Sequence, residues 1–250
     1  MASRKDIEQS LQVLLQSDNF KDYGPNGLQV EGAAEVHRIA SGVTASRAFI
    51  EHALAWGADM LLVHHGLFWR GQDGRLTGWL AERVRLLMVA RVNLFAYHLP
   101  LDAHAELGNN AQLGVRLKLR ADARFGEQGL GFIGPAAAGQ ANVQALATQV
   151  HQALQREPVV LPGDGRLLQR VAWCTGGAQS YFEAAMAAGA DVFITGEISE
   201  PQAHLSRETG VAFLACGLHA TERYGAPAVA AHVAAAFGLE HRFIDVDNPA

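Results

Sequence analysis

Short, continuous apolar runs alternate along this chain with longer segments in which apolar residues recur every three or four positions. Four such runs have the length of strands: "MLLV" (60–63), "NLFAY" (93–97), "VFIT" (192–195) and "AFLAC" (212–216). Continuous apolar runs are typical of parallel strands that are buried on both faces. Between two of them, residues 80–90 place Leu80, Val84, Leu87 and Met88 on one predicted helical stripe. The alternation of strands and helices predicts an α/β fold with mainly parallel strands.

The first part of the chain resembles a later part. Residues 38–66 align without a gap on residues 170–198, and eight aligned positions are identical. Each copy has the pattern of a strand, a helix, a Gly-Ala-Asp sequence and a second strand. Ser46 is a suitable N-cap for the first helix, and Gly57 and Gly189 suit the left-handed residue that ends a helix. The pattern predicts an internal duplication that produces two similar lobes.

The duplication suggests how the chain is divided. We expect residues 1–115 to form the first lobe and residues 166–250 the second, which packs with the first around a shared metal site. Residues 116–165 differ in composition from the two repeated segments, because they are rich in Gly, Pro and Ala before a predicted helix near residues 142–155. We interpret residues 116–165 as a middle insert.

Composition and charge exclude several classes of function. The chain has 250 residues, of which 49% are apolar and 18% charged, as in a soluble globular protein. The net charge of −5 gives no electrostatic argument for nucleic-acid binding. No apolar run approaches the roughly 20 residues that span a membrane, and the first residues lack the apolar core of a signal peptide. With only two cysteines, a cytoplasmic location is expected.

Histidines and carboxylates follow the predicted strands. Ligands of parallel α/β folds bind beyond the carboxyl ends of the strands, so we expect these side chains to converge. Imidazole and carboxylate together suit Zn, Mn, Fe, Co or Ni. The residues that follow the four strands in this way are His64 and His65, then His98, Asp102 and His104, then Glu197, and finally His219 and Glu222.

The adjacent pair His64–His65 predicts more than one ion. Neighbouring residues of a strand point to opposite faces, but at a strand end the two rings can reach two ions about 3.5–4 Å apart that share a carboxylate. The simpler alternative is that each histidine is a hydrogen-bonded loop residue. Likewise, "YGPNGLQVEG" (23–32) can be explained by turns alone, and "HATE" (219–222) by the start of a capped helix.

Seven motifs together resemble a known family. They are "DYGPNGLQVEG", "GVTAS", "VHHGLFW", "HLPLDAHAELGNN", "AWCTGG", "FITGEISE" and "HATERYG". They are similar to motifs of the NIF-three-like dinuclear metal-centre family, also labelled as homologues of the type-two GTP cyclohydrolase. The resemblance implies a two-lobed α/β protein, a hexameric ring and two divalent transition-metal ions per subunit. It implies His64 and His65 as the first two ligands and Asp102 as the bridging ligand. It also implies Glu222 as the last carboxylate ligand.

One position departs from the family pattern. The family usually has a histidine four residues before the last glutamate, whereas this chain has Leu218 in "GLHATE". Leucine cannot coordinate a cation, which puts the second ion in doubt. His219 can substitute from nearly the same helical face, water can take the place of the missing nitrogen, or the second ion is weakly bound or absent.

A site of this kind suits metal-assisted hydrolysis, in which a bound water attacks carbon or phosphorus. In the cyclohydrolase version the substrate is GTP, the attacked atom is C8 of guanine, and formate is released. Glu197 or His98 can transfer protons. The alternative is a non-catalytic ring that stores metal, delivers it or holds partners together. A third possibility, a phosphatase or nuclease, is weakly disfavoured by the negative charge where nucleic acid is the substrate.

Overall fold

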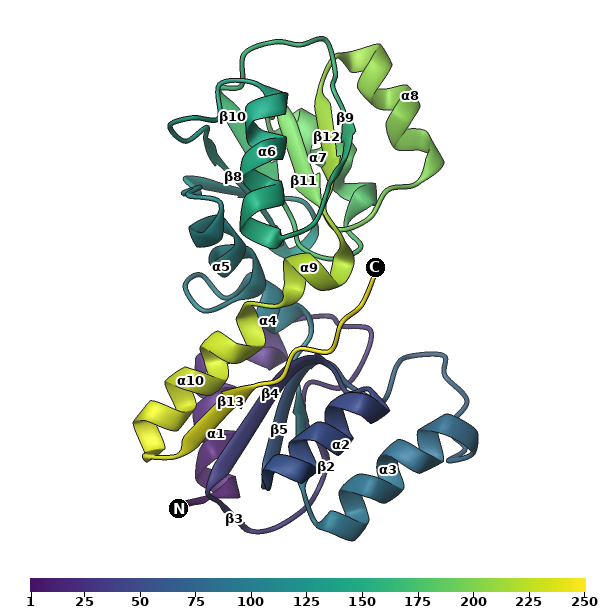
Figure 1. Ribbon diagram of the computed structural model, residues 1–250, viewed down its shortest axis with the longest axis vertical. Helices are drawn as coiled ribbons and strands as arrows, with labels where there is room; N and C mark the ends of the chain where they lie inside the picture. The colour runs from purple at the N-terminus through teal and green to yellow at the C-terminus, as the bar shows by residue number, and fades with distance from the viewer. The chain divides into compact units, whose positions relative to one another are not determined.

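The computed structural model describes residues 1–250 and divides into two compact units. The first unit consists of Met1–Gly108 and Gly225–Asp247, and the second of Asn109–Tyr224 and Asn248–Ala250. In each unit a mixed sheet lies between two layers of helices (Figure 1). The predicted α/β class with a parallel core is therefore confirmed.

The sheet of the first unit has five strands in the order β13-β4-β5-β6-β2. Its centre is parallel, because β5 pairs in parallel with both β4 and β6, and β13 adds to β4 in the same direction. The edge strand β2 is antiparallel to β6. The strands are β2 (Gly27–Val30), β4 (Arg38–Thr44), β5 (Met60–His65), β6 (Asn93–Ala96) and β13 (Glu240–Phe243), with a separate antiparallel pair β1 (Ala2–Ser3) and β3 (Glu35–Val36).

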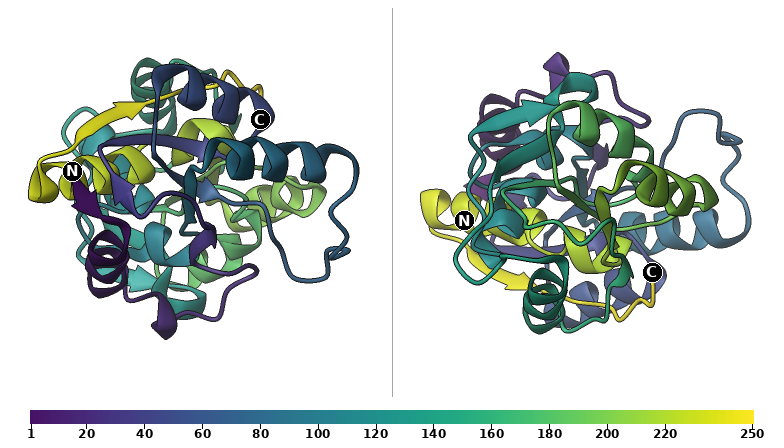
Figure 2. Two further views of the ribbon diagram at one scale, coloured as in Figure 1. Left: turned by 90° about the horizontal axis from the view of Figure 1, so that it is seen from below. Right: turned by 90° about the horizontal axis from the view of Figure 1, so that it is seen from above.

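Helices cover both faces of this sheet (Figures 1 and 2). On one face, Phe49 and Ile50 of α2 and Leu80 of α3 pack against Leu61 and Val63 of β5. On the other face, α1 and α10 contribute a second apolar layer that includes Ile7, Leu11, Val229 and Val233. The helices of this unit are α1 (Arg4–Leu15), α2 (Arg47–Trp56), α3 (Gly78–Ala90), α4 (Leu99–Ala103) and α10 (Gly225–Phe237), with one 3-10 turn at Ser17–Asn19.

The second unit has a six-stranded sheet in the order β7-β8-β10-β11-β12-β9. Strands β10, β11 and β12 are parallel, and β8 and β9 pair with them in the antiparallel direction. The strands are β7 (Ala123–Phe125), β8 (Gly131–Pro135), β9 (Val159–Leu161), β10 (Arg170–Trp173), β11 (Val192–Thr195) and β12 (Ala212–Ala215).

The helices of the second unit also form two layers. Leu113 and Leu146, from α5 and α6, pack on one face of the sheet. Phe182 of α7 packs on the other, where its ring meets those of Phe193 and Phe213. The helices are α5 (Asn109–Arg116), α6 (Val143–Leu154), α7 (Phe182–Ala187), α8 (Glu200–Thr209) and α9 (Leu218–Glu222), with 3-10 turns at Glu127–Gly129 and Gln179–Tyr181.

The internal repeat is longer than the sequence indicates. In each unit a 12-residue helix precedes an antiparallel edge strand, three parallel strands with two intervening helices follow, and a five-residue helix comes after the third strand. The helices that open this series are α1 and α6, the edge strands are β2 and β9, and the five-residue helices are α4 and α9. The repeat thus includes elements whose sequences show no visible similarity.

The boundaries expected from the sequence differ from those of the two units. Residues 116–165 supply β7, β8, α6 and β9, which belong to the second unit's sheet and its helical layer. They are therefore part of the repeated fold and not a separate insert. Residues 225–247, expected in the second lobe, instead complete the first unit with α10 and β13. Apolar packing decides this, since Val229 and Val233 are buried against the first unit's sheet.

The predicted caps of α2 are confirmed, but the prediction that four residues of α3 share one buried face is wrong for one of them. The Ser46 side chain accepts a hydrogen bond from the Phe49 N–H, and Gly57 ends α2 with a φ of 82°. In α3, Leu80, Val84 and Leu87 are buried, but Met88 is 61% exposed. The apolar face of α3 is narrower than the four-residue stripe, and Met88 lies outside it.

The Gly-Ala-Asp sequence has the same structural role in both units. The Asp59 carboxylate accepts hydrogen bonds from the N–H groups of His37 and Arg38, at 2.8 and 3.0 Å. Asp191 does the same at the start of β10, where the N–H groups of Gln169 and Arg170 lie 2.8 and 2.9 Å from its Oδ2. Each aspartate therefore fixes the start of the neighbouring parallel strand.

We predict that Asp59→Ala and Asp191→Ala each lower the free energy of unfolding by about 1–3 kcal/mol, because each leaves backbone N–H groups without their charged acceptor. Urea denaturation followed by circular dichroism measures the loss. Asp247→Ala, at an exposed position, is the control. A loss no larger than that of the control would contradict the shared role.

Candidate metal centre

Three imidazoles meet at the carboxyl end of the first unit's parallel strands. His64 and His65 end β5, and His98 follows β6 directly before α4. One ligand atom of each lies within 4.8 Å of one ligand atom of the others. The ring centroids of His64 and His65 are 4.5 Å apart, and those of His64 and His98 are 5.0 Å apart. The structure thus brings together three of the histidines that the sequence places after strands.

Each of these rings uses Nδ1 for a hydrogen bond. His64 Nδ1 lies 3.0 Å from the carbonyl oxygen of Tyr97; because a carbonyl only accepts, Nδ1 carries the proton and the lone pair of the neutral ring is on Nε2. His65 Nδ1 lies 3.1 Å from Thr44 Oγ1. His98 Nδ1 donates to Asp22 Oδ1 at 2.6 Å. Bonds of this kind to the second nitrogen orient metal-binding histidines and fix their tautomers.

A carboxylate lies beside the imidazoles. Asp102, on the short helix α4, has Oδ1 3.5 Å from His64 Nε2. The sequence favours this helix locally, because Pro100 is its second residue and needs no N–H partner there. His64 is completely buried and Asp102 is 7% exposed. The local donor set therefore combines imidazole nitrogen and carboxylate oxygen in a site shielded from water.

The donor set fits a divalent transition-metal ion. Two nitrogen ligands about 2.0–2.1 Å from one tetrahedral zinc ion lie about 3.4 Å apart. The imidazole ligand atoms within 4.8 Å of one another need only small side-chain rotations to reach that spacing. Imidazole with carboxylate and without thiolate suits Zn, Mn, Fe, Co or Ni.

Asp22 belongs to the site, although it directly precedes residues 23–32, whose sequence can be explained by turns alone. Burial raises the pKa of the Asp22 carboxyl, but hydrogen bonds from His98 and Asn26 lower it more, so that the pKa falls to about 2. The same carboxylate accepts the Leu99 N–H at 2.9 Å. Asn26 Oδ1 accepts the His98 N–H at 2.7 Å. The sequence signal for this contact is an aspartate and an asparagine four residues apart in a turn. The signal does not indicate which residue they contact.

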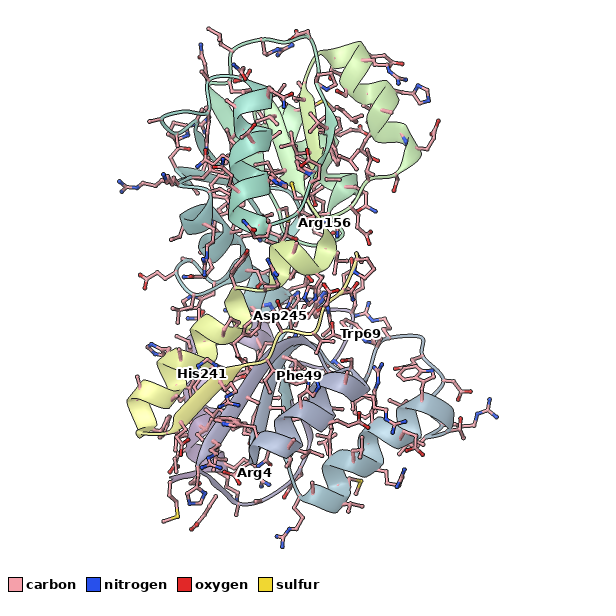
Figure 3. All side chains as sticks on the ribbon, viewed as in Figure 1. Arg4, Phe49, Trp69, Arg156, His241 and Asp245 are labelled. Carbon is pink, nitrogen blue, oxygen red and sulfur yellow. The ribbon has the colours of Figure 1, made fainter.

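Aromatic rings border the imidazoles. Trp69 lies in the segment between β5 and α3 (Figure 3). Its ring centroid is 5.1 Å from that of His98 and 6.0 Å from that of His65. Tyr23 meets His98 edge-on at 6.1 Å. A cavity of about 10 Å³ lies here, which is room for about one water. Its lining residues are Gly24, Pro25, Gln29, His64, Gly66, Phe68, Trp69, Ala96 and His98.

The remaining predicted ligands belong to the second unit. Glu222 and His219 are on α9 and are 3% and 8% exposed. A Cβ atom at Gly176 would lie 2.1 Å from Glu222 Oε1, so the carboxylate packs directly on the glycine after β10. Thr221 Oγ1 holds α9 in place by donating to Gly217 O and accepting the Gly176 N–H. The ligand roles of His219 and Glu222 stay predictions.

The second unit has no counterpart of the histidine pair. Gly196 and Glu197 occupy the positions aligned with His64 and His65. A Cβ atom at position 196 would lie 2.6 Å from both Gly176 O and Leu218 Cα. The tight backbone contact excludes an imidazole there, so the duplicated scaffold provides one imidazole cluster per chain.

His104 has a structural role in the first unit. Its Nδ1 accepts the N–H groups of Glu106 and Leu107, at 3.2 and 3.0 Å. The ring therefore holds the turn after α4 and is absent from the imidazole cluster. For this residue the simpler reading, a hydrogen-bonded loop histidine, describes the structure.

Fold and site together define an α/β protein with a partly buried cluster of potential metal ligands. The family model described as "Duf34/NIF3 (NGG1p interacting factor 3)" matches residues 2–249. The chain belongs to this family.

Individual relatives agree with this assignment. Proteins named "GTP cyclohydrolase 1 type 2 homolog" from Neisseria meningitidis serogroup A and Escherichia coli K12 are 49% and 42% identical to the chain. The first alignment covers 100% of both chains, and the second covers 98% of both. The crystal structure of TTHA1606 from Thermus thermophilus matches with a TM-score of 0.88 and 32% identity, over 100% of both chains.

The double variant His64→Ala/His65→Ala is predicted to lose bound transition metal, since it removes two of the clustered nitrogen donors. Elemental analysis of the purified protein after dialysis measures the metal content. His52→Ala/His232→Ala, which removes two exposed histidines of the same unit, is the matched control. Equal metal content in the two double variants would count against the ligand assignment.

Proposed function

We propose that this protein binds divalent transition-metal ions through His64, His65 and Asp102. We further propose that it is a hydrolase whose activity depends on these ions. The observation that carries the proposal is the partly buried imidazole cluster, with ligand atoms within 4.8 Å of one another, beside the Asp102 carboxylate. Bound divalent ions supply Lewis acidity and lower the pKa of a water toward 7. The finer form of the proposal is a dinuclear centre to which Glu222, His219 or both contribute.

The residues of the first unit would prepare the site for that chemistry. The Tyr97 carbonyl and Thr44 hold the imidazole planes through Nδ1, so little reorganisation is needed on binding an ion. Asp102 supplies negative charge, which partly neutralises a divalent ion in buried surroundings. Trp69 borders the imidazoles and limits access of bulk water.

We propose a nucleotide or related small molecule as the substrate. The support is the name of the relatives, GTP cyclohydrolase 1 type 2 homolog, which itself records only homology. For GTP, hydrolysis at C8 of the guanine ring opens the ring and releases formate. A net charge of −5 does not favour nucleic acid as the substrate.

A non-catalytic metal-binding, delivery or scaffold role is the alternative function. The observation in its favour is the small cavity of about 10 Å³ beside His64 and His98, which is too small to hold a nucleotide. The hexameric ring and the cytoplasmic location, expected from the sequence, also stay predictions. No helix of the structure is both long and apolar enough to cross a membrane.

If the protein is a cyclohydrolase, metal-loaded protein with GTP and Mn²⁺ or Zn²⁺ releases formate, and the His64→Ala/His65→Ala variant does not. A coupled formate assay measures the product. The control is the wild-type protein stripped of metal by a chelator. If the folded, metal-loaded protein releases no formate with any of several metals, the binding role is favoured over hydrolysis of GTP.

A further inference from the structure

The hydrogen bond between Asp22 and His98 links residues that are 76 positions apart in the chain. The Asp22 side chain is 3% exposed, and the His98 side chain is 21% exposed. Three more donors reach the same carboxylate: the Leu99 N–H and the Asn26 side-chain amide, both at 2.9 Å, and the Tyr23 N–H at 2.6 Å. The four N–H groups directed at this carboxylate require its oxygens to act as acceptors, so the His98 proton is on Nδ1.

These hydrogen bonds hold His98 at two places, its backbone N–H and its imidazole ring. Asn26 Oδ1 accepts the backbone N–H of His98 at 2.7 Å, and Asp22 accepts Nδ1–H at 2.6 Å. With the proton on Nδ1, the lone pair of the neutral ring is on Nε2. The His98 ring centroid lies 5.0 Å from that of His64 and 5.9 Å from that of His65.

We propose that His98 Nε2 is a third imidazole ligand of the metal centre and that Asp22 is its positioning residue. The inference rests on the proposed metal-binding function and deepens it, because it assigns a nitrogen donor and the carboxylate that holds it. Carboxylate–histidine–metal arrangements fix the tautomer, orient the ring and raise the basicity of the ligating nitrogen. The Asp22 carboxylate accepts hydrogen bonds from His98, Leu99, Asn26 and its neighbour Tyr23 in this arrangement.

The site gives this pair a role beyond holding the loop. Asn26 already ties the loop to the His98 backbone, and Asp22 already accepts the Leu99 N–H; neither bond requires an imidazole at position 98. A purely structural residue there would not need ligand atoms within 4.8 Å of those of His64 and His65. Three imidazoles are also the donor set of one class of zinc site.

The first experiment measures Zn²⁺ affinity by competition with a chromophoric chelator. His98→Ala is expected to weaken binding at least tenfold, because it removes a ligand. Asp22→Asn is expected to weaken binding by about tenfold to 100-fold, the usual effect of losing the group that orients a ligand. His204→Ala is the matched control, since His204 forms a similar 2.7 Å bond to Glu200 on an exposed surface; its affinity should equal that of the wild type.

A second measurement tests the ligand role of His98 in the wild-type protein itself. In the ¹⁵N spectrum of histidine side chains, Zn²⁺ addition to the wild-type protein should shift His98 Nε2 while Nδ1 keeps its proton. In Asp22→Asn the Nε2 shift should require more Zn²⁺, although the metal-free variant has a wild-type circular dichroism spectrum. A residue that only stabilises the loop would not change this titration.

The outcomes separate the inference from the proposed function. If the wild-type protein binds Zn²⁺ and loses it in His64→Ala/His65→Ala, but His98 Nε2 does not shift and His98→Ala binds normally, the inference is overturned and the metal centre stands. If the wild-type protein binds no Zn²⁺, Mn²⁺ or Co²⁺, the proposed function fails, and the inference fails with it.

Discussion

The parallel register of three strands is the constraint on which the candidate site depends. Thr44 of β4 pairs with His65, and Val63 of β5 pairs with Ala96 of β6. Because the strands run in the same direction, the residues that follow these pairs emerge at one edge of the sheet. Thr44, the histidine pair of β5 and His98 come together for this reason, and their hydrogen bonds then only adjust ring orientation. A slip of one residue would turn each side chain to the opposite face.

Both units have this register, yet only one carries imidazoles. In the second unit the same edge is built from Gly176, Gly196 and Gly217 and from Thr221, whose hydroxyl bonds to backbone groups. Close backbone contacts replace side-chain donors there. The duplication thus supplied one scaffold twice, and side-chain volume at the strand ends determines which copy can accommodate a cluster of ligands.

The sequence predicts the features that depend on local pattern. The parallel strands, the cap at Ser46 and the exit of His64 and His65 from β5 follow from apolar periodicity and short motifs. The contact of Asp22 with His98 does not, because it depends on where β2 adds to the sheet. The place of residues 116–165 was missed for a similar reason: Gly-rich strands such as β8 carry little apolar signal. Met88 shows that periodicity overestimates the width of a buried face.

The first unit is discontinuous in sequence, and this has a consequence for synthesis on the ribosome. The chain leaves the first unit after Gly108 and returns at Gly225, so α10 and β13 emerge after all the strands of the second unit's sheet. Until then the nascent chain exposes the apolar face formed by Ile39, Met60 and Leu62, which Val229 and Val233 later cover. The sheet whose strand ends carry the histidine cluster is consequently completed after the second unit's sheet, and its exposed apolar face makes the nascent chain prone to aggregation until then.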